Sequence, residues 1–86
     1  MKDKRILIIG GTGALGKTLI RTYQNSNNIR VFSRDEHKQV YLMSADWVNK
    51  NNVSCMIGDV KDKDSISNAL IEYKPDIVIN AAALKH

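Results

Sequence analysis

The stretch RILIIGGTGALGKT, residues Arg5 to Thr18, decides the fold of this 86-residue chain. Its first part, Arg5–Ile9, is apolar after the arginine, which is typical of a strand buried on both faces of a parallel sheet. A glycine-rich loop follows, and apolar residues then recur at helical spacing at Leu15, Leu19, Ile20 and Tyr23. Glycines between a buried strand and a helix expose backbone N–H groups at the helix N-terminus, where phosphate groups bind. The sequence therefore predicts a phosphate-binding turn near its start.

Two phosphate-binding patterns share this loop. The P-loop pattern of ATP and GTP enzymes, G-x-x-x-x-G-K-[ST], is completed by Gly11, Gly16, Lys17 and Thr18. The dinucleotide pattern G-x-G-x-x-G is completed by Gly11, Gly13 and Gly16, and the related G-x-x-G-x-x-G spacing by Gly10, Gly13 and Gly16. Both patterns use glycines to bring the backbone close to phosphate oxygens, so the loop by itself does not distinguish them.

The rest of the chain alternates strands and helices. Further strands are expected at residues 29–32, 53–57 and 77–79. Asp35 is the expected N-cap of the second helix, and Asp64 or Ser65 that of the third, which Pro75 ends after Lys74. The apolar faces of these two helices are predicted to contain, in order along the chain, Val40, Met43, Trp47, Ile66, Ala69, Leu70 and Tyr73.

This order of elements predicts an α/β fold in a single domain, residues 1–86. The fold is a Rossmann-type doubly wound parallel sheet, truncated to about four strands in the order 3-2-1-4 and three helices. The first two helices are expected on one face, and the third helix on part of the other. The fourth strand would be an open apolar edge, which is a pairing hazard. We therefore expect the remainder of a longer chain, or a second copy in a homo-oligomer, to cover it.

Composition narrows the class of protein further. The chain is 43% apolar and 26% charged, as in soluble globular domains, and its net charge of +4 is scattered rather than gathered into a nucleic-acid-binding stripe. Cys55 is the single cysteine and is expected to be a small core residue. His37 and His86 lack partners at metal-ligand spacing, so no metal site is predicted. Neither a membrane span nor a signal peptide is recognisable, which predicts a cytoplasmic location.

Residues after the second and third strands favour the dinucleotide pattern. A P-loop enzyme needs a magnesium carboxylate at the end of another strand, but the fourth strand ends at Asn80, and Asp59 is a poor substitute. Ser33 and Arg34 follow the second strand at about the offset of the ribose selector. A hydroxyl and a guanidinium suit a 2′-phosphate, which favours NADP over NAD. Asp59 could accept the adenine amino group while Val60 covers the ring, or Gly58-Asp59 could simply be a turn.

With these residues in place, the chain resembles the extended short-chain dehydrogenase/reductase superfamily. More narrowly, it resembles the inverting UDP-N-acetylglucosamine 4,6-dehydratases and related polysaccharide biosynthesis proteins. The resemblance rests on the blocks GGTGALGKTL, VFSRDEHKQ, GDVKDKDSI and DIVINAAALKH. His37, Asn80 and the segment from Val40 to Asn52 depart from the family pattern.

The resemblance implies a set of NADP-binding residues. They are Gly10, Thr12, Gly13, Ala14, Leu15 and Gly16 in the loop; Ser33, Arg34, Asp35, Glu36, His37 and Lys38 around the 2′-phosphate; Asp59 and Val60 at the adenine; and Ala81 and Lys85 against the cofactor. Lys85 is also implied to contact the UDP-sugar substrate. The catalytic lysine, acid and tyrosine-like residues of the family lie beyond the equivalent of His86, so no catalytic residue is predicted in this chain.

Three functions stay open at this point. The first is the NADP-binding portion of a nucleotide-sugar 4,6-dehydratase/5-epimerase that acts on UDP-N-acetylglucosamine-type substrates and is inactive alone. The second is a non-catalytic dinucleotide-binding module. The third is a P-loop NTPase or kinase. No nucleic-acid or membrane partner is expected for any of them.

Overall fold

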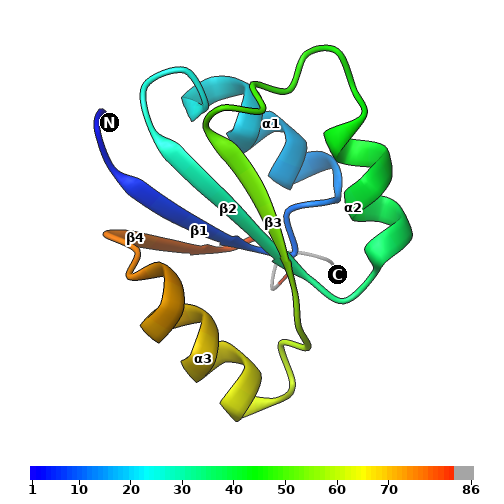
Figure 1. Ribbon diagram of the computed structural model, residues 1–86, viewed down its shortest axis with the longest axis vertical. Coiled ribbons are helices and arrows are strands. Elements are labelled where there is room, and N and C mark those ends of the chain that lie inside the picture. The colour runs from blue at the N-terminus through cyan, green and yellow to red at the C-terminus, as the bar shows by residue number, and fades with distance from the viewer. Residues whose placement is uncertain (83–86) are drawn as a thin grey trace.

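The computed structural model of the chain describes residues 1–82. Its elements are β1 (Arg5–Ile9), α1 (Ala14–Tyr23), β2 (Asn28–Ser33), α2 (Glu36–Met43), β3 (Val53–Ile57), α3 (Lys63–Tyr73) and β4 (Ile77–Asn80). The strands form one parallel sheet in the order β3-β2-β1-β4 (Figure 1). The predicted fold class and strand order are confirmed. The second and fourth strands are slightly longer than predicted.

The register of the sheet brings the carboxyl ends of its strands together. Ile9 at the end of β1 pairs with Phe32 of β2 on one side and with Asn80 of β4 on the other. On β2, Ser33 pairs with Ile57 at the end of β3. The loops that follow all four strands therefore leave the sheet at one end, which is where parallel α/β sheets bind their ligands.

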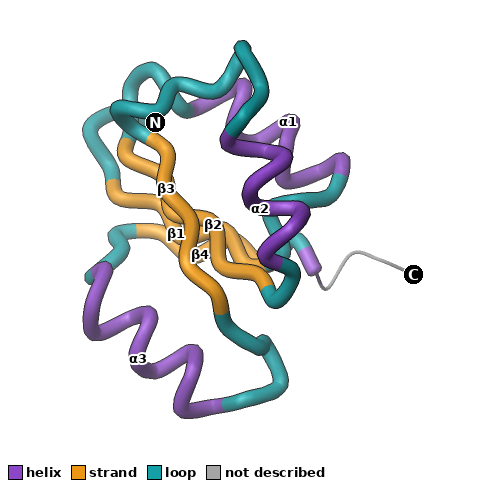
Figure 2. The backbone as a smooth tube through the Cα atoms, turned by 45° about the vertical axis from the view of Figure 1, so that its right-hand side comes forward, coloured by secondary structure: helices purple, strands orange, loops and turns teal. Residues whose placement is uncertain are grey.

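Helices cover both faces of the sheet, as the sequence predicts. Figure 2 shows α1 and α2 on one side and α3 on the other. Ile6 and Ile8 of β1 pack with Ile20 of α1 and Leu42 of α2, whereas Leu7 and Ile9 face α3. Because β1 is buried on both faces, its apolar residues do not alternate with polar ones. The α3 side is less fully covered, since Val78 on the edge strand β4 is 47% exposed.

The predicted apolar face of α2 is confirmed for Met43 and Trp47, which pack against the core cluster, but it is wrong for Val40. Val40 is 63% exposed, and the buried residues of this helix are Gln39 and Leu42. The helix has only eight residues and ends at Met43, so Trp47 lies in the turn that follows. There the guanidinium carbon of Arg21 lies 4.0 Å from the centroid of the Trp47 ring. Only the first position of the face differs, because Gln39, and not Val40, turns toward the sheet.

The N-cap of α3 is Asp62, not Asp64 or Ser65. The Asp62 carboxylate accepts hydrogen bonds from the backbone N–H groups of Asp64 and Ser65, at 3.0 and 3.4 Å. The backbone N–H of Asp62 in turn donates to the carbonyl of Asp59 at 3.0 Å, which fixes the helix start one turn after β3. The other end is as predicted, since Lys74 takes a left-handed conformation with φ of 53° before Pro75. In α2, the predicted cap Asp35 is confirmed by its bond from the Lys38 N–H.

This correction makes a testable difference between two neighbouring aspartates. We expect Asp62→Ala to lower the free energy of unfolding by about 1 kcal/mol, because two N–H groups lose their acceptor. Asp64→Ala removes only a first-turn charge and should cost less than about 0.5 kcal/mol. Urea unfolding of both variants measures the difference. Equal losses would contradict the assignment of Asp62 as the cap.

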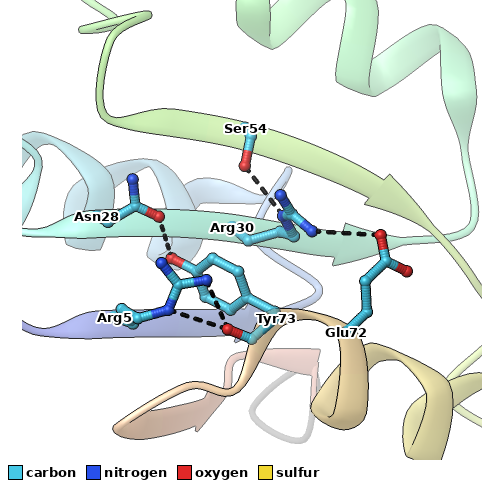
Figure 3. A network of polar contacts seen from close by, with 6 residues as sticks. All are labelled: Arg5, Asn28, Arg30, Ser54, Glu72 and Tyr73. Carbon is cyan, nitrogen blue, oxygen red and sulfur yellow. Dashed lines mark hydrogen bonds and ion pairs between the residues drawn. The ribbon is translucent and has the colours of Figure 1, made fainter.

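A polar network joins the last turn of α3 to the starts of β1 and β2 (Figure 3). Arg5 donates two hydrogen bonds to the Tyr73 carbonyl, at 2.9 and 2.6 Å, and the Tyr73 hydroxyl donates to Asn28. The guanidinium carbons of Arg5 and Arg30 lie 4.2 and 4.7 Å from the centroid of the Tyr73 ring. Arg30 also donates to Ser54 and pairs with Glu72 at 3.8 Å. This network holds α3 at the end of the sheet opposite the strand carboxyl ends.

Candidate functional site

A cleft of about 570 Å³ lies at the carboxyl ends of the strands. Its walls come from the last residues of β1 and β2 and from the segments after all four strands. The lining residues are Ile9, Gly10, Thr12, Phe32, Ser33, Arg34, Asp35, Glu36, His37, Lys38, Gly58, Asp59, Val60, Lys61 and Ala82. Residues that are far apart in the sequence, such as Gly10, Arg34 and Asp59, thus surround one space. Ten of the residues implied by the family resemblance lie in this lining, namely Gly10, Thr12, residues 33–38, Asp59 and Val60.

The remaining implied residues lie elsewhere. Gly13, Ala14, Leu15 and Gly16 belong to the first turn of α1 or its cap, just beyond the lining of the cleft. Ala81 is 4% exposed and packs with the core, while the adjacent Ala82 lines the cleft. Lys85 and His86 lie outside the described residues. Sequence reasoning missed five lining residues, and all but the first of them lie within the blocks that carry the resemblance: Ile9, Phe32, Gly58, Lys61 and Ala82.

Two glycines make the turn from β1 into α1 possible. Gly10 has φ of 78°, a left-handed conformation, and a Cβ there would lie 2.8 Å from the Cβ of Ala82. A Cβ at Gly16 would lie 2.3 Å from the carbonyl oxygen of Gly11, far inside van der Waals contact. Gly16 therefore allows α1 to pack directly on the loop, which is the third-glycine role of the dinucleotide fold.

The start of α1 is suited to an anion. Gly13 is the N-cap and has no side chain to accept from the first-turn N–H groups, and the first turn contains no acidic residue. Those N–H groups and the positive end of the helix dipole are thus available to phosphate oxygens. Thr12, which directly precedes the cap, lines the cleft, so the start of α1 lies beside it.

The P-loop pattern does not form a P-loop turn. The helix already begins at Ala14, so Gly16, Lys17 and Thr18 are helical residues rather than loop residues. The Thr18 hydroxyl donates to the carbonyl of Ala14 at 3.1 Å, within its own helix. Only residues 10–13 connect β1 to α1, which is too short a loop to wrap a triphosphate. The geometry favours the dinucleotide pattern.

The end of β2 presents a hydroxyl and a guanidinium to the cleft. Ser33 is half-buried, and its hydroxyl oxygen accepts a hydrogen bond of 2.8 Å from the side-chain amide of Gln39. Arg34 is the next residue and is exposed along the cleft wall. Asp35, by contrast, has its carboxylate engaged as the α2 cap. Asp35, which lies one residue beyond the expected ribose selector, therefore caps α2, as its place in the sequence suggests.

The end of β3 forms a tight turn against Phe32. A Cβ at Gly58 would lie 2.3 Å from the Phe32 ring and 2.4 Å from the Ser65 hydroxyl, so only glycine fits. One carboxylate oxygen of Asp59 accepts from the Lys61 N–H at 2.9 Å. Asp59 thus has a structural role in the turn, and its carboxylate still lines the cleft beside the exposed Val60. The two interpretations of Gly58-Asp59 are compatible.

A second, basic groove of about 370 Å³ adjoins the cleft. It is lined by Thr12, Gly13, Lys17, His37, Lys38 and Tyr41, and it shares Thr12, His37 and Lys38 with the cleft. Lys17 therefore extends from α1 toward α2 rather than into open solvent. Lys17 and Lys38 give this groove a positive charge, whereas the cleft lining combines Arg34 with the acidic Asp35 and Glu36.

Cys55 lies apart from the cleft. It is half-buried and packs against the core cluster under α1 and α2, as a small core residue would. Burial raises the pKa of its thiol above the ordinary value.

The described residues, 1–82, contain no helix long and apolar enough to cross a membrane.

Comparison with known proteins identifies the family of this chain. A profile described as polysaccharide biosynthesis protein matches residues 6–86. The chain belongs to this family. The resemblance seen in the sequence is thereby confirmed. The fold of this family member is also similar to that of a solved short chain dehydrogenase/reductase family protein, with a TM-score of 0.77 at 21% identity over 93% of this chain and 34% of that one.

Relatives of this polysaccharide biosynthesis family member are several times longer. An inverting UDP-N-acetylglucosamine 4,6-dehydratase of Campylobacter jejuni is 46% identical over 87 residues, covering 96% of this chain and 25% of that protein. A UDP-glucose 4-epimerase of Rickettsia prowazekii is 39% identical over 89 residues, with the same coverage. An uncharacterised membrane protein of Methanocaldococcus jannaschii is 39% identical over 85 residues, covering 99% and 25%. The chain thus spans about a quarter of the length of these relatives.

A solved structure has a fold similar to that of this chain. The X-ray structure of Pen from Bacillus thuringiensis superposes on this family member with a TM-score of 0.84 and 39% identity. The match covers 99% of this chain and 27% of that one. The likeness therefore concerns about a quarter of that chain.

Proposed function

We propose that this chain is the NADP-binding portion of a UDP-sugar-modifying enzyme of polysaccharide biosynthesis. The observation that carries the proposal is the cleft that joins the glycine turn, the Ser33-Arg34 pair and Asp59 at one end of the sheet. The named relatives are a UDP-N-acetylglucosamine 4,6-dehydratase and a UDP-glucose 4-epimerase, and both names specify a UDP-sugar substrate. We favour the 4,6-dehydratase/5-epimerase activity because SRDEHKQ and AAALKH are the blocks that resemble the dehydratase group most specifically.

The residues of the cleft fit a nicotinamide dinucleotide. The pyrophosphate would lie at the Gly10 turn and at the uncapped start of α1. The turn has room for it because Gly10 has no side chain. Ser33 and Arg34 would hold the ribose 2′-phosphate, with Lys38 and His37 beside them. Asp59 and Val60 would bind the adenine. When bound, NADP⁺ supplies a hydride acceptor and later a hydride donor for sugar chemistry. We propose that the catalytic acid and base come from residues outside these 86.

The exposed edge strand supports the view that more protein packs here. Val78 on β4 is 47% exposed and lies on the α3 side of the sheet, where α3 leaves the edge open. An apolar parallel edge of this kind pairs or is covered in natural proteins. We propose that the rest of a longer chain covers it, with a second copy as the alternative. The cytoplasmic location stays a prediction of the sequence.

Isothermal titration of the chain with NADP⁺, NAD⁺ and Mg·ATP tests the cofactor proposal. We expect NADP⁺ to bind at least about tenfold more tightly than NAD⁺, and Mg·ATP to give no saturable heat, because α1 begins too early to form a P-loop. The matched control is Lys17→Ala, which removes the lysine that a P-loop requires and should leave no ATP-dependent change. Tight Mg·ATP binding that Lys17→Ala abolishes would reject the dinucleotide site.

The same chain offers a test of the catalytic proposal. Incubation with NADP⁺ and UDP-N-acetylglucosamine is expected to give no 4-keto product, since none of the site residues is assigned as acid or base. Turnover by the 86 residues would show that they contain their own catalytic groups. A different result would favour the non-catalytic dinucleotide-binding module. In that case the chain would bind NADP⁺ but not the sugar nucleotide, and it would form a defined oligomer that buries β4.

A further inference from the structure

The buried amide of Gln39 lies directly behind the cleft residue Ser33. Gln39 is on α2, is 6% exposed, and is absent from the residues that line the cleft. Its side-chain nitrogen lies 2.8 Å from the Ser33 hydroxyl oxygen, 2.9 Å from the Met56 carbonyl and 3.2 Å from the Ser33 carbonyl. The amide thus bridges the ends of β2 and β3.

The orientation of this amide follows from its partners. The carbonyl oxygens of Ser33 and Met56 can only accept hydrogen bonds, so the NH₂ group, and not the oxygen, must face them. An NH₂ group has two protons and no lone pair to offer. Its two shortest contacts are to the Met56 carbonyl and the Ser33 hydroxyl, and these two oxygens therefore accept the two hydrogen bonds that the group can donate.

The consequence concerns the single proton of the Ser33 hydroxyl. A serine hydroxyl has one proton to donate and two lone pairs to accept with. Since Gln39 donates to Ser33 and cannot accept from it, the hydroxyl proton must point elsewhere. Ser33 lines the cleft, so its hydroxyl proton is available to an anionic oxygen placed there without competition from Gln39. Such pre-orientation spares the ligand the cost of ordering the group.

We propose that Gln39 is a specificity-determining positioning residue, which orients the Ser33 hydroxyl as a donor to the 2′-phosphate of NADP without touching the cofactor. The proposal rests on the NADP site proposed above. A hydrogen bond to a phosphate is charge-assisted and stronger than one between neutral groups. Only a ligand with the 2′-phosphate gains from the fixed hydroxyl, so Gln39 should act on the preference between NADP and NAD.

A double-mutant cycle on the full chain tests this role, with the dissociation constants of NADP⁺ and NAD⁺ as readouts. We expect Ser33→Ala to weaken NADP⁺ binding about tenfold, with NAD⁺ binding changed less than about twofold. Gln39→Met keeps the side-chain volume but removes the donor, and it should weaken NADP⁺ about fivefold while leaving NAD⁺ binding nearly unchanged. In the Ser33→Ala background, Gln39→Met should add less than about a twofold loss.

The readouts separate positioning from stability. A purely structural role for Gln39 would lower both affinities equally, or would add its full effect to that of Ser33→Ala, and either result overturns the proposal. An unchanged ratio of the two affinities in Ser33→Ala also overturns it. Should Gln39→Met fail to fold, Gln39→Asn keeps the amide but draws it back by one methylene, and the same NADP⁺-specific loss is expected.

The wild-type chain distinguishes this inference from the function on which it rests. Equal wild-type affinity for NADP⁺ and NAD⁺ would overturn the NADP assignment together with the role of Gln39. A clear wild-type preference for NADP⁺, combined with additive losses in the cycle, would leave the NADP assignment intact and overturn the Gln39 inference alone.

Discussion

Gly16→Ala is expected to destabilise the chain and to abolish most of its dinucleotide affinity. In an exposed helix, alanine is about 1 kcal/mol more favourable than glycine, so propensity alone predicts a gain. Here the added Cβ would lie 2.3 Å from the Gly11 carbonyl oxygen and 2.4 Å from the Gly11 Cα. Backbone atoms cannot move aside as a flexible side chain can, and overpacking costs about 1–3 kcal/mol even in side-chain cores. We expect the clash to outweigh propensity, with a net loss of about 2 kcal/mol.

Cofactor affinity should fall with it, because the Cβ must move α1 away from the loop. The N–H groups at the start of α1 would then lose their alignment with the pyrophosphate, and we expect NADP⁺ to bind more than about tenfold more weakly. Urea unfolding and titration with NADP⁺ measure the two effects. The matched control, Lys17→Ala, changes the adjacent residue of the same turn and should keep stability within about 0.5 kcal/mol. A stable Gly16→Ala variant with wild-type affinity would contradict the close packing of α1 on Gly11.

The sheet could be predicted from the sequence because its signals are local and redundant. The apolar run of β1, the glycine turn and the alternation of strand with helix each point to the same parallel topology. The carboxyl ends of parallel strands meet at one edge, so the topology alone predicts that Ser33, Arg34 and Asp59 lie near one another. Residues adjacent to strand ends are the ones whose positions topology alone determines.

Details that depend on competing side chains could not be predicted in the same way. Asp62, Asp64 and Ser65 are all good caps, and the choice of Asp62 depends on the hydrogen bond of its N–H to the Asp59 carbonyl in the preceding turn. Gln39 takes a core position in α2 that a hydrophobic pattern assigns to an apolar residue. Its burial is tolerated because its amide meets the acceptors at the ends of β2 and β3. The polar residue that breaks the pattern is thus linked to the site.

Arg34→Ala is expected to separate the two nicotinamide cofactors. Arg34 is exposed along the cleft wall directly after β2, where the guanidinium can form a forked pair with a phosphate. Hydrogen bonds to a charged group contribute about 1.5–3 kcal/mol, which corresponds to roughly 10–100-fold in affinity. We expect that loss for NADP⁺ and less than about a twofold change for NAD⁺, as measured by titration at about 0.15 M ionic strength. Arg34→Lys keeps the charge but not the fork and should fall between wild type and alanine.

The control for Arg34→Ala must remove the same charge at another place. Arg21 lies seven residues after the start of α1, about 10 Å along the helix, and stacks on Trp47. At this ionic strength a charge at that distance is largely screened, so Arg21→Ala should leave both affinities within about twofold. If Arg34→Ala weakened NADP⁺ and NAD⁺ equally, its side chain would serve the fold or the shared adenosine, and the 2′-phosphate would have to be held by Lys38 or Lys17 in the adjoining basic groove. A loss for NADP⁺ alone, absent in Arg21→Ala, would assign the 2′-phosphate to the end of β2.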